Sequence, residues 1–137
     1  MRGQAAIETL VMVGFAIAFM IPLVLLFFTA TSSETGKTSI AQAKSSVRLI
    51  AVEAGEIYLQ GNGSRKMIVV NYPDGIINGS AGDGLVVLRI YTDGRQLDLT
   101  SPTFANITGN LDGRRTSGVQ RINLVNVDGR YVNITYG

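Results

Sequence analysis

Glu8 is the residue in this sequence whose position most needs a chemical explanation. It stands near the start of a segment that is otherwise built of Ala, Ile, Leu, Val, Met and Phe. A lone carboxylate in hydrocarbon costs about 2.5–3.5 kcal/mol even on lenient insertion scales, so it is normally paired, neutralised or placed at an interface. We therefore expect Glu8 to find a partner outside its own helix or to rest at the level of the lipid headgroups.

The composition removes most reagents of enzyme chemistry. The chain has neither Cys nor His, which excludes disulfides, thiol catalysis, a Cys/His zinc site and imidazole acid–base chemistry. Five aspartates precede a glycine, and their spacing does not match a calcium-binding loop. The net charge is +2, from 12 basic and 10 acidic residues, without a basic stripe for nucleic acid. We expect no catalytic residue, metal site, cofactor or nucleic-acid partner.

An apolar helix must position Glu8. From Leu10 to Ala30, 21 residues carry no charge, and Thr29 alone has a hydrogen-bonding side chain. At about 1.5 Å per residue this segment is long enough to cross the roughly 30 Å of bilayer hydrocarbon. We predict a membrane helix over residues 4–30.

Three residues inside this helix bear on its packing. Pro22 removes one backbone hydrogen bond and predicts a bend or local melting near residues 18–22. Gly14 and Ala18 form a small-xxx-small pair, which lets another helix backbone approach closely. A solitary membrane anchor with ordinary glycine content explains the pair equally well.

The residues before the apolar segment form a recognisable motif. Their order is Arg2, Gly3, Gln4, Ala5, Ala6, Ile7, Glu8. A cleaved secretory signal places a small-residue cleavage site after its apolar core, whereas Gly3 precedes it here. This arrangement resembles the class III signal peptide of archaeal type IV pilin-like proteins, in which a membrane peptidase cuts before a glutamine and a glutamate stands fifth in the mature chain. Gln4 and Glu8 match both features.

The resemblance implies a filament-forming membrane protein. Residues 1–3 would be a leader that a prepilin peptidase removes between Gly3 and Gln4, and residues 4–30 would be the transmembrane and filament-core helix. A secretion-type ATPase and a membrane platform would drive assembly, from a membrane precursor to an extracellular surface filament. Archaellins share the processing route but usually carry glycines where this chain has Ala6 and Glu8, so they are the less close match.

Residues 31–60 predict a second helical segment. Thr31–Lys37 is polar and contains Gly36, which indicates a hinge or a weakened helical turn. The following apolar residues recur at spacings of 3 and 4 and predict one buried stripe of an amphipathic helix. They are Ile40, Ala43, Val47, Ile50, Ala54 and Ile57. Gly61 is a suitable stop.

Residues 61–137 predict a β-rich head. Five Asp-Gly and two Asn-Gly pairs, among them Asn62-Gly63 and Asn78-Gly79, indicate tight hairpin turns. The predicted strands are Lys66–Tyr72, Ile76–Asn78, Leu85–Thr92, Arg95–Thr100, Thr103–Thr108, Val119–Val127 and Arg130–Tyr136. We expect an α+β protein in which a small antiparallel sheet, β-sandwich-like or strongly curled, packs on the amphipathic helix.

Surface features of the head indicate where it resides. Four sequons occur, at Asn62, Asn78, Asn106 and Asn133, and each is a possible N-glycan acceptor if the head is outside the cytoplasm. The polar connection between residues 109 and 118 contains Arg114, adjacent to Arg115, and reads as a solvated loop or as a contact point for neighbours or anionic surfaces.

One charge pattern opposes an external head. Lys37, Lys44 and Arg48 follow the apolar segment, so the positive-inside rule alone would place the head in the cytoplasm. The signal motif, the sequons and the β-rich head favour the outside.

These observations favour a structural role. The main hypothesis is a type IV pilus-like filament subunit that binds copies of itself through its apolar helix and has an external head for adhesion. The alternative is a minor pilin or a membrane-anchored surface protein whose head binds a ligand or carbohydrate. A tethered enzyme would need clustered acid, base or nucleophile residues, and the scattered aspartates do not provide them.

Overall fold

The computed structural model describes residues 2–112 and 117–137. One helix, α1 (Arg2–Gln60), precedes a seven-stranded sheet, which gives the α+β class expected from the sequence. The strands are β1 (Arg65–Tyr72), β2 (Ile76–Gly82), β3 (Leu85–Thr92), β4 (Arg95–Pro102), β5 (Ile107–Asn110), β6 (Gly118–Val127) and β7 (Tyr131–Tyr136). The chain forms two compact units, which meet between Thr35 and Gly36.

The first unit is a helix whose described side chains are exposed. It is long and apolar enough to cross a membrane, as its composition predicted. The helix continues through Pro22, so the local melting expected there is absent. Thr9, Thr29 and Thr31 donate their hydroxyl hydrogens to carbonyl oxygens four residues earlier, each at 2.9 Å. Because these bonds satisfy the hydroxyl groups within the helix, the threonines are tolerated in apolar surroundings.

The backbone remains helical over residues 31–37, where the sequence suggested a hinge or a weakened turn. One helical glycine costs about 1 kcal/mol relative to alanine, which is too little to end a helix that is extended on both sides. Gly36 is buried, and a Cβ at this position would overlap the carboxylate of Asp93 in the β3–β4 turn. The glycine therefore allows close approach of this turn to the helix.

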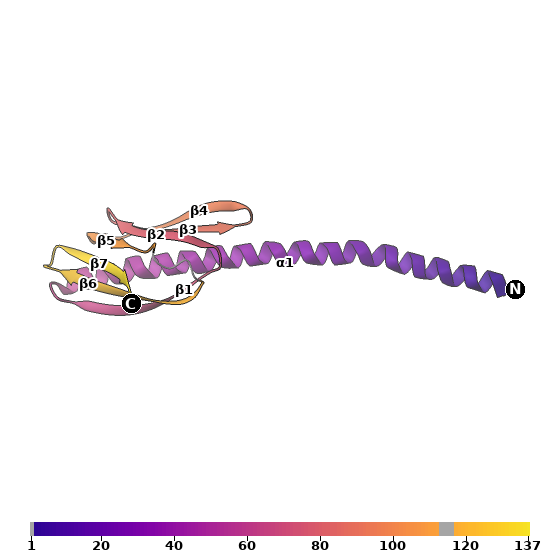
Figure 1. Ribbon diagram of the computed structural model, residues 1–137, viewed down its shortest axis with the longest axis horizontal. Coiled ribbons are helices and arrows are strands. Elements are labelled where there is room, and N and C mark those ends of the chain that lie inside the picture. Colours follow the sequence, from indigo (N-terminus) through magenta and orange to yellow (C-terminus); the bar gives the residue numbers. More distant parts are fainter. Residues whose placement is uncertain (1, 113–116) are drawn as a thin grey trace. The chain divides into compact units, whose positions relative to one another are not determined.

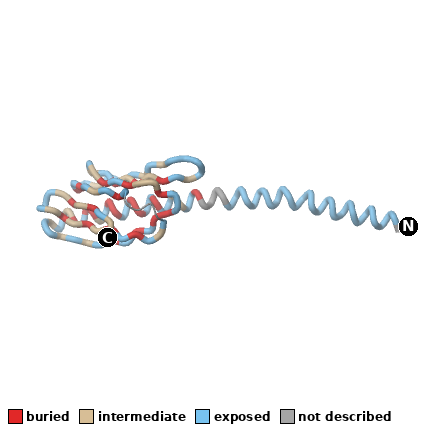
Figure 2. Tube along the Cα trace, in the orientation of Figure 1, coloured by how far each residue is buried: buried red, intermediate tan, exposed pale blue. Residues whose placement is uncertain are grey.

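The predicted apolar stripe of α1 forms the centre of the head. Ala43, Val47, Ile50, Ala54 and Ile57 are each at most 1% exposed, and Figure 2 shows the buried positions of the head part of α1. Burial of each of the three larger side chains, those of Val47, Ile50 and Ile57, contributes about 1.5–3 kcal/mol. Packing of this stripe against the sheet therefore holds residues 36–60 in the head.

All seven strands belong to one curled sheet, in the order β1-β6-β7-β5-β2-β3-β4. Strands β2, β3 and β4 lie on one side of α1 in Figure 1, and β1 and β6 lie on the other. The sequence predicted an antiparallel head that was either sandwich-like or strongly curled. The single curled sheet agrees with the second form, but β5 and β7 are parallel, and no second sheet forms among the described residues. Because the helix fills the centre, one curled sheet can cover it from both sides.

Most strands lie where their alternating patterns predicted them. The Asp-Gly turns are also confirmed at Asp83, Asp93 and Asp128, whose φ values of 51°, 51° and 54° are followed by positive φ at the next glycine. This pair of positive values is typical of type I′ turns. At Asp83 and Asp93 the turn joins a two-residue hairpin, whereas the β6–β7 connection has three residues, 128–130.

Two predictions in the middle of the head were wrong. Asn78-Gly79 lies inside β2 and is not a turn, because Gly79 is buried and a Cβ there would lie 3.0 Å from Leu111. The strand predicted at Thr103–Thr108 begins only at Ile107. The Thr103 hydroxyl oxygen accepts a hydrogen bond from the Ala105 backbone N–H at 3.3 Å, and such a local bond competes with strand pairing.

Candidate self-association surface

The first unit presents an apolar surface that nothing in the described chain covers. Every described side chain from Gly3 to Thr31 is exposed, including Phe15, Leu26 and Phe28 at 67%, 71% and 65%. Soluble monomers rarely expose apolar patches larger than a few hundred Å². This exposed apolar surface is compatible with a membrane anchor or a signal sequence.

The residues singled out for assembly lie along this exposed helix. Glu8 is exposed, and it forms no ion pair with the side chains that the structure describes. A Cβ added at Gly14 would meet nothing within 4 Å, so this position is open to an approaching helix. Gly14, Ala18 and Pro22 do not line the shallow groove of about 410 Å³ on this helix. That groove is lined by Ala16, Ile17, Met20, Ile21, Val24 and Leu25.

The predicted processing site begins α1. Gly3 and Gln4 both lie in the helix and are exposed, and a Cβ at Gly3 would meet nothing within 4 Å. No contact within the described chain restricts the residue at this position. A requirement for glycine would therefore come from the peptidase, and the cleavage itself stays a prediction.

The head also has an exposed apolar strip where the curled sheet leaves α1 open. Val52 and Leu59 are exposed on the helix, and Phe104 is 70% exposed beside them. A groove of about 470 Å³ separates the helix from the segment that follows β4. It is lined by Ala51, Val52, Pro102, Thr103 and Phe104.

Phe104 lies over a helical glycine. A Cβ at Gly55 would be 2.9 Å from the Phe104 ring, and Tyr58 contacts this ring edge-on with centroids 6.5 Å apart. This role of Phe104 was not predicted from the sequence, because the pattern of residues 103–108 indicated a strand. The Ser101-Pro102 pair, which favours the start of a turn, was the available signal in the sequence.

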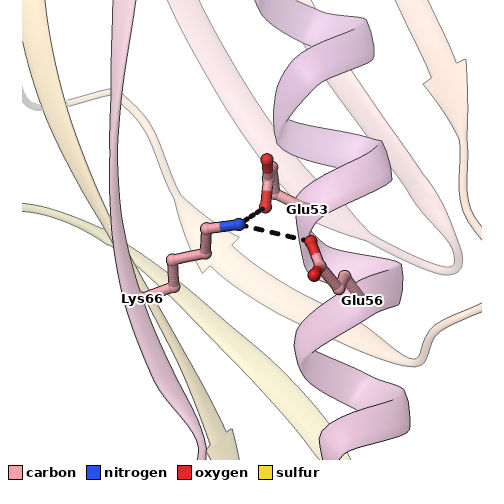
Figure 3. Close-up of polar contacts among 3 residues, drawn as sticks. All are labelled: Glu53, Glu56 and Lys66. Atoms are coloured by element: carbon pink, nitrogen blue, oxygen red, sulfur yellow. Dashed lines mark hydrogen bonds and ion pairs between the residues drawn. The ribbon is translucent and has the colours of Figure 1, made fainter.

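On the opposite flank of the helix, charged and polar side chains connect α1 to β1. Lys66 of β1 donates to Glu53 at 2.5 Å and to Glu56 at 3.2 Å, as Figure 3 shows. The hydrogen bond to Glu53, followed by that to Glu56, raises the pKa of Lys66. Further along, the Ser46 hydroxyl group lies 2.9 Å from the carbonyl oxygen of Asn71. Polar contacts thus connect β1 to α1.

The carbonyl groups at the end of the helix are capped by Asn126, a role that was not predicted from the sequence either. Asn126 of β6 is buried, and its side-chain Nδ2 donates to the carbonyl oxygens of Ile57 and Tyr58 at 3.2 Å each. These are carbonyls of the last turn, which lack partners within a helix. Gly61 follows with a φ of 87° and donates its N–H to Tyr58 at 3.3 Å. Only the glycine was predictable as a stop signal.

The four sequons lie in two kinds of surroundings. Asn62 and Asn106 are exposed in connections, whereas Asn78 and Asn133 are half-buried within β2 and β7. Arg114 and Arg115 lie outside the described residues. Within residues 2–112 and 117–137, no cluster of three or more acidic residues comes together that could hold a metal ion.

Comparisons with known proteins assign no family. The chain matches no family model, no curated protein and no solved structure. Function must therefore be argued from the residues and surfaces of this chain.

Proposed function

We propose that this protein is a structural subunit of a type IV pilus-like surface filament and polymerises through the apolar part of α1. The observation that carries the proposal is the complete exposure of the described apolar side chains between Gly3 and Thr31, with Glu8 as the acidic residue among them. A bundle of identical helices replaces lipid with an equally apolar environment when the subunit leaves the membrane. Contacts of this heterologous type extend into an open helical filament when the rotation between neighbours does not close a ring.

The motif at the amino terminus supports this function. Cleavage between Gly3 and Gln4 by a prepilin peptidase would remove Arg2 and leave 11 basic against 10 acidic residues, a net charge of +1. Gln4 would then begin the mature chain, with Glu8 as its fifth residue. An assembly ATPase and a membrane platform would move the subunit from the membrane into the filament, with the β head outside for adhesion or surface attachment.

The experiment that tests the proposal is the recovery of polymers. Cells that make the protein are sheared, and the released material is sedimented and examined by negative-stain electron microscopy. A filament subunit is expected in long polymers whose intact mass lacks residues 1–3. Recovery of the whole protein in the membrane fraction, with Met1–Gly3 still present, would contradict the proposal.

One observation on the head favours a second candidate. The groove beside Phe104 has a volume of about 470 Å³, within the range typical of small-ligand sites. A minor pilin or a membrane-anchored surface protein that binds a ligand or carbohydrate would use such a groove. Such a protein would be a rare filament component or would stay with the membranes after shearing.

A further inference from the structure

Of the four sequon asparagines, Asn62 and Asn106 lie in chain connections, whereas Asn78 and Asn133 lie in paired strands. Ser64 donates its backbone N–H to Gly61 at 3.3 Å, which closes a turn with Asn62 and Gly63 at its centre. Gly63 has a φ of 81°, the value that a type II turn requires at its third position. Asn62 is exposed, so the sequon Asn62-Gly63-Ser64 spans the tip of a tight turn.

The second exposed sequon begins in the connection before β5. Asn106 is exposed, as is Thr108, which supplies the sequon hydroxyl group. The Asn106 side chain donates to the carbonyl oxygen of Arg130 at 3.2 Å, and its backbone carbonyl accepts from Val132 at 2.8 Å. Both contacts hold the residue at the surface, beside the start of β7.

The other two asparagines lie in strands with partners on both sides. In the sequon at Asn78, the N–H of Gly79 donates to Asp112 and its carbonyl accepts from Leu111. Ser80 of the same sequon pairs with both β3 and β5. Asn133 lies in β7 between Val125 of β6 and Thr108 of β5. Neither of these two asparagines can enter an enzyme's active site without local unfolding of a strand that is paired on both sides. The Asn106 sequon enters the sheet only at Ile107 and Thr108, which pair on one side, with β7.

The two exposed asparagines lie at the same end of the head. A Cβ on Gly129 would lie 4.0 Å from the Cβ of Asn62, and Asn106 binds the adjacent Arg130. Both asparagines therefore flank the β6–β7 turn, residues 128–130, which is exposed.

We propose that Asn62 and Asn106 are the N-glycan acceptors of the folded head, and that Asn78 and Asn133 are not modified. The donor is an oligosaccharide carried on a lipid phosphate, used by a membrane-bound transferase. The side-chain nitrogen of asparagine attacks the anomeric carbon and loses one proton. The carbon–oxygen bond to phosphate breaks, the carrier phosphate leaves, and a carbon–nitrogen bond forms. This rests on the proposed function only in requiring an external head.

The location of the glycans has a consequence for assembly. Two bulky, hydrated groups beside the β6–β7 turn would prevent close packing of a neighbour at this end of the head. In a filament the end at which α1 terminates therefore faces solvent.

The test is the intact mass of protein isolated from the cells that make it, with glycopeptide mapping. Wild type is expected to carry two glycans; Asn62→Gln and Asn106→Gln should each remove one, and the double variant both. Asn78→Gln and Asn133→Gln are matched controls that should keep both glycans. Ser64→Ala and Thr108→Ala, which retain the asparagines, should repeat the two losses and guard against misfolding of the glutamine variants.

Three outcomes would overturn the proposal: a bare polypeptide mass for wild type, an unchanged glycan mass in Asn62→Gln or Asn106→Gln, or a glycan lost from either strand variant. The last outcome would mean that modification precedes folding. Protein from the membrane fraction is sufficient for this mass measurement. If no filaments formed, the proposed function would be refuted, but the glycan sites could still be determined.

Discussion

Glu8 is the single residue whose energy depends most on what surrounds the helix. In a staggered stack of processed subunits, the Glu8 carboxylate of one helix can reach the new amine of Gln4 on the next. This ion pair would offset the desolvation penalties of both charged groups. It would also fix the axial position of each helix relative to the next, which apolar packing cannot do because it is non-directional. A Gln4 that cyclises to pyroglutamate lacks this amine. The Thr9 hydroxyl group, the other donor nearby, already donates to Ala5.

We expect Glu8→Gln to be inserted and processed normally but to assemble poorly, because the uncharged amide cannot form the ion pair. Filament yield and length by electron microscopy measure the effect, and co-expression with wild type should shorten the filaments. Thr9→Val is the matched control, since Thr9 bonds within its own helix. Filaments of normal length and yield from the Glu8→Gln strain would exclude an assembly role for the charge.

Processing makes a separate prediction at Gly3. Gly3→Leu should leave the precursor uncleaved, because a peptidase at the membrane edge needs a small residue there, while Gly3→Ala should still be cleaved. The substitution does not disturb the described chain, in which a Cβ at Gly3 would meet nothing within 4 Å. Intact mass distinguishes the two forms. Assembled Gly3→Leu protein that has lost residues 1–3 would contradict the prediction.

Tyr72 makes the head sensitive to alkaline pH. Burial, followed by the hydrogen bond to Tyr136, raises the pKa of Tyr72 far above its ordinary value of 10.0. Because the unfolded chain loses this proton first, stability is fully present below about pH 10 and declines as the pH rises above it. Tyr72→Phe should flatten this decline in unfolding of the full-length protein in detergent, followed by circular dichroism. Tyr91→Phe, at an exposed site, should leave this decline unchanged. If stability depended on pH equally in the two variants, the role assigned to Tyr72 would be refuted.

At the level of elements, the buried stripe of α1 stabilises the head. Val47→Asp would bury an unpaired charge in the centre of the curled sheet and should destabilise the protein by about 3–5 kcal/mol. Val52→Asp is a matched control on the same helix, because Val52 is 60% exposed. Denaturant unfolding of the full-length protein in detergent measures both. A similar loss of stability in the two variants would show that burial of Val47 is not the cause.

The elements also show which parts of the fold the sequence could predict. Local patterns were sufficient for the helical character of α1, although they suggested a hinge over residues 31–37 that the helix does not have. They were also sufficient for the turns at Asp83, Asp93 and Asp128 and for the hairpin β3–β4, whose partners are close in sequence. They were insufficient for β5, which pairs in parallel with β7 across about 25 residues, and for Gly79, whose role depends on Leu111. Asn126 caps a helix end nearly 70 positions earlier, and such long-range partners leave no local pattern.

For the candidate site too, local features could be predicted from the sequence, and features that depend on long-range contacts could not. The apolar helix and Glu8 are visible in sequence, because hydropathy and charge are properties of single residues and segments. The groove beside Phe104 forms only when the segment after β4 lies against Gly55. The difference between exposed and strand sequons likewise depends on strand pairing, which identical three-residue motifs do not reveal.

At the scale of the whole molecule, the filament and glycan proposals both depend on the side of the membrane on which the head lies. The exposed Lys44 and Arg48 follow the apolar segment and favour a cytoplasmic head by the positive-inside rule. Glycan acceptors and surface filaments both require an external head. The cysteine-free chain suits a labelling measurement, since a single introduced cysteine is then the only thiol of this chain that a maleimide reagent can label.

We expect Thr100→Cys, exposed on the edge strand β4, to react in intact cells with a maleimide that cannot cross membranes. Val86→Cys, at a position that is 0% exposed, should react only after denaturation and thereby controls for folding. The resemblance to type IV pilins and the four sequons predict external labelling against the pull of the basic residues. Labelling of Thr100→Cys only after the cells are permeabilised would place the head in the cytoplasm and refute both the filament and the glycan assignments.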